Sequence, residues 1–85
     1  MKKTAKNIIN KEMCGRVLTR ITEVATAKGW HGIKDTHAYK TIVDILAMDD
    51  DKIGYVEKET LHNMMELLCV CSGQWYYDII KEVCA

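Results

Sequence analysis

The sequence predicts an all-α fold, a compact bundle of about four helices. Apolar residues recur at intervals of three and four in four segments, and no stretch shows the alternation that a strand requires. Proline is absent and only 5 glycines occur among 85 residues, which is unlike a turn-rich β protein. A chain of this length has room for one hydrophobic core, so we predict a single helical domain over residues 1–85.

Residues 7–27 and 36–48 form the first two predicted helices. In each of them the apolar side chains fall on one stripe. The stripe of the first helix is Met13, Val17, Ile21 and Val24, and that of the second is Tyr39, Ile42, Val43 and Leu46. Gly29 suits the position just after the first helix, and Asp35 or Thr36 can cap the start of the second.

Residues 56–72 and 74–84 form the third and fourth predicted helices. Glu57 and Glu59 favour the positive end of the third helix dipole, and Gly73 can end that helix. The apolar positions are Leu61, Met64, Met65 and Leu68 in the third helix and Trp75, Tyr76, Ile79, Ile80 and Val83 in the fourth. The same spacing places Tyr77 on the opposite, exposed side.

The third helix carries more apolar surface than one face holds. Residues 67–71 are all apolar and consecutive, so their side chains point around the whole helix. We therefore expect this helix to lie at the centre of the bundle, or to be covered by a second copy of the chain. Leu67, Val70 and Cys71 are the predicted self-association residues, and the chain is predicted to be a homo-oligomer.

The cysteines and the polar start of the chain indicate where the protein resides. Cys14, Cys69, Cys71 and Cys84 are interpreted as reduced, small apolar side chains, with disulfide bonding and metal ligation as alternatives. Lys6, Asn7 and Asn10 interrupt the apolar run that an export signal needs. No apolar run approaches the ~20 residues of a membrane span. We expect a cytoplasmic protein without a membrane segment.

Charge is balanced overall but not along the chain. The 12 basic and 12 acidic residues cancel, yet residues 1–28 hold seven basic against two acidic residues and the remainder is acidic. The first helix is expected to lie against the acidic segments. An alternative, which is disfavoured, is nucleic-acid binding through Lys6, Lys11, Arg16 and Arg20. This basic segment has no interleaved aromatic residue on which a base could stack.

Asp49, Asp50 and Asp51 form an acidic connection after the second helix. The run resembles the first part of an EF-hand loop, but Ile53 and Thr60 occupy two positions that need oxygen ligands. We therefore predict no metal site. Because carboxylates at a helix C-terminus are disfavoured by the dipole, the three aspartates are expected to face a cation, either Arg16, Arg20 or the basic patch of a partner.

Two aromatic features complete the candidate interaction residues. Trp30 and His31 stand between Gly29 and Gly32, where the tryptophan either plugs one end of the core or forms an exposed recognition tip. Tyr77 is predicted to be exposed beside Asp78, where it can contact a partner. The hypothesis that follows places the acidic connection and Tyr77 at or near one partner surface.

The remaining patterns contain no catalytic constellation and no cofactor motif. The sequence therefore predicts a small non-enzymatic interaction protein: a regulator, adaptor or inhibitor that docks on a larger protein and self-associates, without a cofactor. The alternatives are the nucleic-acid-binding protein described above and an oligomer that binds a small molecule or an ion.

Overall fold

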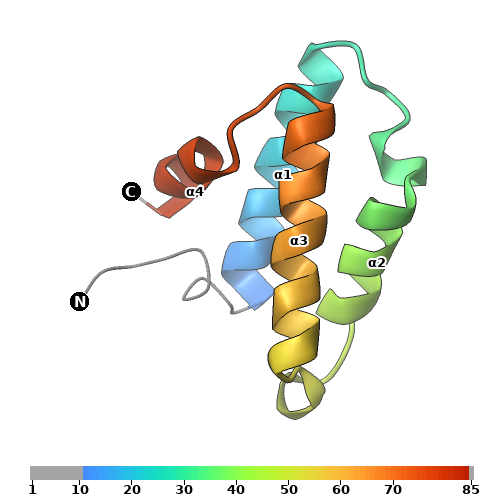
Figure 1. The fold of residues 1–85 in the computed structure, drawn as a ribbon, viewed down its shortest axis with the longest axis vertical. Helices are drawn as coiled ribbons and strands as arrows, with labels where there is room; N and C mark the ends of the chain where they lie inside the picture. The colour runs from blue at the N-terminus through green and yellow to red at the C-terminus, as the bar shows by residue number, and fades with distance from the viewer. Residues whose placement is uncertain (1–10, 85) are drawn as a thin grey trace.

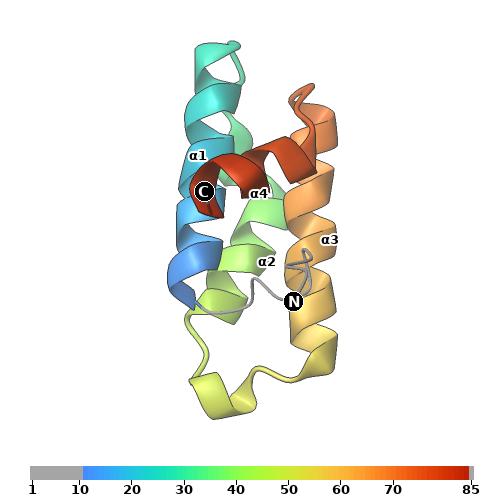
Figure 2. The same cartoon turned by 90° about the vertical axis from the view of Figure 1, so that its left-hand side faces the viewer.

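The computed structural model describes residues 11–84, and within them it contains four α-helices and no strand. The helices are α1 (Lys11–Ala27), α2 (His37–Leu46), α3 (Tyr55–Cys71) and α4 (Tyr76–Cys84), and helical residues make up 80% of this part of the chain. α1, α2 and α3 run up, down and up along the long axis (Figure 1). Figure 2 shows α4 crossing over α1 and α3. The prediction of an all-α bundle is confirmed.

The helix boundaries differ from the predicted ones by a few residues. The first helix begins at Lys11 within the described residues, so the predicted residues 7–10 lie outside them. The second helix ends at Leu46 rather than residue 48. Two 3-10 turns, η2 (Ile33–Asp35) and η3 (Asp50–Lys52), precede α2 and α3. The sequence pattern did not predict them, because a single tight turn has no hydrophobic period of its own.

Two glycines end α1 and α3 in the same way. Gly29 has a φ of 101° and Gly73 has a φ of 70°, the left-handed region that favours glycine. The amide of the residue after each glycine then donates to a carbonyl five residues back: Trp30 to Ala25 at 2.9 Å, and Gln74 to Cys69 at 2.8 Å. These Schellman motifs stop both helices where the sequence predicts.

The fourth helix begins later than predicted, and Trp75 lies outside it. The Trp75 carbonyl accepts hydrogen bonds from the amides of Asp78 and Ile79, so this residue stands at the helix start instead of within its first turn. The helical spacing therefore does not apply to Trp75, and its side chain is 63% exposed. The prediction that Trp75 lies on the apolar face was wrong, whereas Tyr76 on that face is buried.

The buried apolar side chains form one cluster to which all four helices contribute. α3 contacts each of the other three helices, as expected of a central helix, and α1 does so as well. α3 is not enclosed, however, because one side of it faces solvent. The largest fully buried side chains are Ile21, Ile33, Ile42, Leu61, Met65 and Leu68.

Polar contacts tie the α3–α4 connection to α1. The side-chain nitrogen of Gln74 donates to the Ile21 carbonyl at 3.2 Å, and Lys28 Nζ donates to the Gly73 carbonyl at 3.0 Å. Arg20 Nε lies 2.7 Å from a carboxylate oxygen of Glu82 in α4. The C-terminal ends of α1 and α3 consequently lie side by side.

Candidate functional site

The side of α3 that faces away from the core carries a line of five residues. Their positions are separated by four, three, four and three residues, so they share one helix face opposite the core residues. The line, called the outer stripe below, consists of Val56, Thr60, Asn63, Leu67 and Val70. Val56 is 71% and Val70 is 68% exposed, and Leu67 is also exposed. Three large apolar side chains of the outer stripe therefore face solvent.

The predicted self-association residues lie on or beside this stripe. Leu67, Val70 and Cys71 are exposed, while their neighbours Leu68 and Cys69 are buried. The apolar run of residues 67–71 thus divides between the core and the solvent.

An exposed aromatic pair follows at the end of α3. The ring centroids of Trp75 and Tyr77 lie 5.6 Å apart, and both side chains are exposed. Tyr77 is also 5.7 Å from the ring of the buried Tyr76, which anchors the pair to the core. Exposed tryptophan and tyrosine held by a rigid support are frequent energetic centres of protein interfaces.

The acidic turn faces lysines instead of the expected arginines. Asp49, Asp50 and Asp51 are exposed in and beside η3. Lys11 Nζ lies 3.6 Å from Asp50, and Lys52 Nζ lies 3.7 Å from Asp49. The prediction that Arg16 or Arg20 faces the acidic turn was wrong, because their positions on α1 bring both arginines to other carboxylates.

Those other carboxylates belong to α1 itself and to α4. Arg16 pairs with Glu12 at 2.7 Å, one helical turn earlier, and Arg20 pairs with Glu82 at 2.7 Å. Each described candidate for nucleic-acid contact therefore faces a carboxylate; these candidates are Lys11, Arg16 and Arg20. Lys6, the remaining candidate, lies outside the described residues. This pairing reduces the positive field that a phosphate backbone would require.

The acidic turn and Tyr77 lie at opposite ends of α3. Seventeen residues of helix separate them, which corresponds to about 25 Å of rise. The bundle therefore does not unite them in one compact site. Trp30 and His31 lie at the Tyr77 end, where α1 ends beside α3. Trp30 is half-buried against the core, as expected of a plug, and His31 is exposed.

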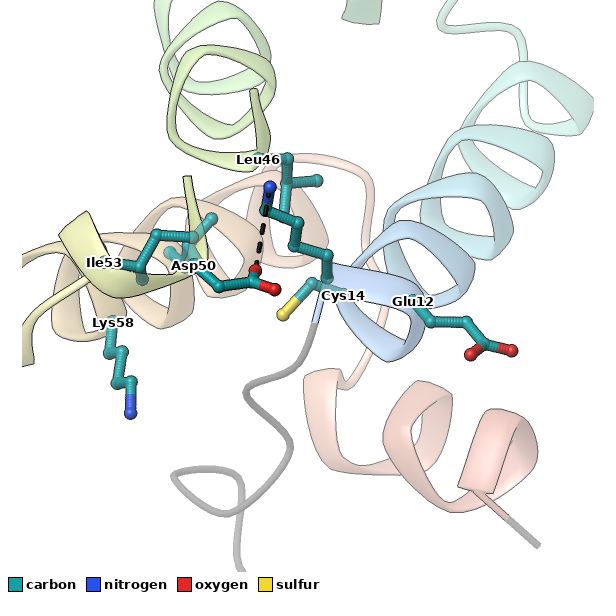
Figure 3. Close-up of a pocket in the computed structure, with 8 residues that line it drawn as sticks. Glu12, Cys14, Leu46, Asp50, Ile53 and Lys58 are labelled. Atoms are coloured by element: carbon teal, nitrogen blue, oxygen red, sulfur yellow. Dashed lines mark ion pairs between the residues drawn. The ribbon is translucent and has the colours of Figure 1, made fainter. Parts of the chain in front are cut away.

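A cavity of about 360 Å³ lies at the end of the bundle that carries the acidic turn. In Figure 3 the Asp50 carboxylate points toward Cys14, whereas Glu12 and Lys58 extend away from one another. The lining residues are Lys11, Glu12, Cys14, Leu46, Asp50, Ile53, Lys58 and Leu61. Two lysines and two carboxylates thus surround one opening, and Lys11 and Asp50 neutralise each other, so the charges favour no single class of small ligand.

The buried thiols are poor nucleophiles. Burial raises the pKa of Cys14 to about 11 and that of Cys69 to about 12, so both thiols stay protonated at neutral pH. Among residues 11–84, no group of three or more His, Cys, Asp or Glu side chains is arranged to hold a metal ion. In the same range no helix has the length and apolar character to cross a lipid bilayer.

The raised pKa values of these two thiols lead us to expect a loss of stability at alkaline pH. An unfolded thiol ionises near its ordinary pKa of 9.0, whereas Cys14 and Cys69 stay protonated to about 11 and 12 in the folded state. The unfolded state therefore loses protons first, and the free energy of unfolding falls as the pH rises above about 9. Urea denaturation at increasing pH measures this fall. The double variant Cys14→Ala/Cys69→Ala is expected to show a shallower fall, and an equally steep one would contradict the assignment.

Comparison with known proteins finds no matching protein-family model, no similar curated protein and no matching solved structure. The fold defines the class, a small all-α bundle, and its candidate functional surface is the outer stripe with the aromatic pair. Sequence reasoning missed two exposed residues of that surface, Val56 and Trp75. The four-and-three spacing from Val56 to Val70 is the signal that would have found the outer stripe.

Proposed function

We propose that this chain is a non-enzymatic interaction protein that docks on a larger protein through the outer stripe of α3 and the adjoining aromatic pair. The observation behind the proposal is the line of exposed apolar side chains, Val56, Leu67 and Val70, on a helix whose other side is well packed. Covering an exposed valine or leucine side chain contributes up to about 1.5–3 kcal/mol. Regulators, adaptors and inhibitors act in this manner, by occupying a surface of another protein.

The same proposal includes a cellular location, the cytoplasm. The four cysteines occur as free thiols, two of them buried in the core. Free thiols are typical of proteins in a reducing compartment. We therefore place the proposed activity in the cytoplasm.

Self-association is a second part of the proposal and uses the same surface. Leu67, Val70 and Cys71 are accessible to a second copy of the chain. A contact through a single helix face buries little area, so this association is expected to be weak and to depend on concentration. Sedimentation velocity at increasing protein concentration tests it, and a constant monomer at all concentrations would contradict it.

The variant Val70→Glu tests the docking surface. It places a charge between Leu67 and the aromatic pair, and it is expected to abolish capture of the proteins that the wild type retains from a nuclease-treated lysate. Tyr55→Glu is the matched control, because Tyr55 is 67% exposed at the opposite end of α3, where a carboxylate also suits the helix dipole.

The control is expected to retain the same proteins as the wild type. Equal capture by Val70→Glu and wild type would overturn the proposed surface. Far-UV circular dichroism confirms that both variants keep the fold, which is expected because both positions are exposed.

A further inference from the structure

We propose that the partner element seated on the outer stripe is an amphipathic helix whose apolar stripe is bordered by lysine or arginine. This inference rests on the proposed function and specifies the chemistry of the partner. Two features of α3 support it: the spacing of the stripe and the charge beside it.

The spacing of the outer stripe fits another helix. Alternating steps of four and three are the seam of a coiled coil, in which each side chain fits between four residues of the facing helix. From Val56 to Val70 the seam extends over about 21 Å, the length of four helical turns. Thr60 and Asn63 occupy its middle, and polar groups within a seam help to define the register of the pair.

The charge beside the stripe is exclusively acidic. Glu59 and Glu66 are exposed, stand seven residues apart, and border the stripe on the same side. Neither of them forms an ion pair with another side chain among residues 11–84. No lysine or arginine occupies the outward-facing positions of α3. Basic residues that flank the apolar stripe of the partner helix would therefore meet two carboxylates that form no ion pair with another side chain of residues 11–84.

The aromatic pair extends this preference at the Val70 end. Trp75 and Tyr77 are 63% and 44% exposed, in and after the turn that follows α3. Lysine and arginine are attracted to the faces of tryptophan and tyrosine rings. A basic residue near the end of the partner helix is thus expected to find an aromatic contact there.

A second copy of the chain is a less suitable occupant. Pairing two outer stripes brings Glu59 and Glu66 of both copies, four carboxylates in all, into one interface without a cation on either stripe. Like charges at an interface oppose association, and salt screens that repulsion. Self-association is therefore expected to strengthen as salt is added, whereas binding of a basic helix is expected to weaken.

Two synthetic helical peptides of three heptads provide the test. Both carry leucine at the seam positions; one has lysine at the flanking positions and the other has glutamate. Fluorescence anisotropy with the full chain is expected to show at least about tenfold tighter binding of the lysine peptide, with an affinity that falls as salt rises.

The variant Glu59→Lys/Glu66→Lys is expected to reverse the preference, so that the glutamate peptide binds more tightly. Asp35→Lys/Asp44→Lys is the matched control: it changes the net charge by the same amount at exposed positions on η2 and α2, away from the stripe. This control is expected to keep the preference for the lysine peptide, since only charges beside the seam face the partner.

The remaining outcomes overturn the inference. Equal binding of both peptides would mean that the outer stripe binds the apolar side chains of a partner helix regardless of the charge beside them. Failure of both peptides, with capture from lysate still sensitive to Val70→Glu, would leave the proposed function standing and remove the basic helix as the partner. Failure of both peptides, with dimers that tighten as salt rises, would identify the second copy as the occupant.

Discussion

Replacing Ile21 with alanine is expected to lower the free energy of unfolding by about 3–4 kcal/mol. Ile21 is 0% exposed in the core cluster, and its carbonyl accepts the hydrogen bond from Gln74, so the helix has little freedom to close the cavity. A chain of this size has a total stability of only about 4–13 kcal/mol. The substitution is therefore expected to remove between about a quarter and nearly all of that stability.

Urea denaturation followed by far-UV circular dichroism measures this loss. Thr19→Ala, an exposed position on the same helix, is the control and is expected to change the free energy of unfolding by less than about 0.5 kcal/mol. A loss below about 1 kcal/mol for Ile21→Ala would show that the core around α1 is loosely packed.

Tyr76→Ala is expected to be comparably destabilising, at about 3–5 kcal/mol, because it removes a buried aromatic ring. Tyr76 is the first residue of α4, and its hydroxyl lies 2.8 Å from His62 Nδ1 of α3, so one side chain holds the two helices together. Burial raises the pKa of the Tyr76 hydroxyl, which stays protonated and able to donate. Without the ring, α4 is expected to separate from α1 and α3 before the remaining helices unfold.

Hydrogen exchange of the α4 amides relative to those of α2 measures that separation. Tyr76→Phe keeps the ring and loses only the hydroxyl, so it is expected to cost about 1–2 kcal/mol and to leave α4 protected. Equal losses from the two substitutions would mean that the hydrogen bond with His62, rather than the packing of the ring, holds α4 in place.

The position of Tyr76 also determines which variants can test the docking surface. Its ring lies 5.7 Å from that of Tyr77, so losing Tyr76 would displace the aromatic pair along with α4. A binding defect of Tyr76→Ala would therefore not distinguish a lost contact from a lost fold. Val70 and Glu66 are exposed on α3, and substitutions there change the surface without removing a core contact.

Much of the fold follows from local patterns in the chain. The apolar stripes predict four helices, and Gly29 and Gly73 stop α1 and α3 as expected of residues that accept a positive φ. Thr36, one of two predicted caps, accepts the amide hydrogen of Tyr39 at 3.2 Å. These features are local because each depends on residues within about one or two helical turns.

The candidate site was only partly predictable. Apolar residues all around α3 indicated surplus surface at Leu67, Val70 and Cys71, and these residues are exposed. The hypothesis that the acidic turn and Tyr77 lie at or near one partner surface stays a prediction, and the direction of α3 places the two features at its two ends. Trp75 was misplaced since its position depends on the exact residue at which α4 begins.

Sequence alone thus determined the number of helices, their approximate limits and the imbalance of charge along the chain. Tertiary structure decided which apolar residues of α3 face solvent and which carboxylate each basic residue of α1 meets. Lys11 pairs with Asp50, and Arg20 pairs with Glu82, across 39 and 62 residues of sequence. The physical reason is that helical periodicity is set by neighbouring residues, whereas ion pairs and exposed surfaces depend on how whole helices pack together.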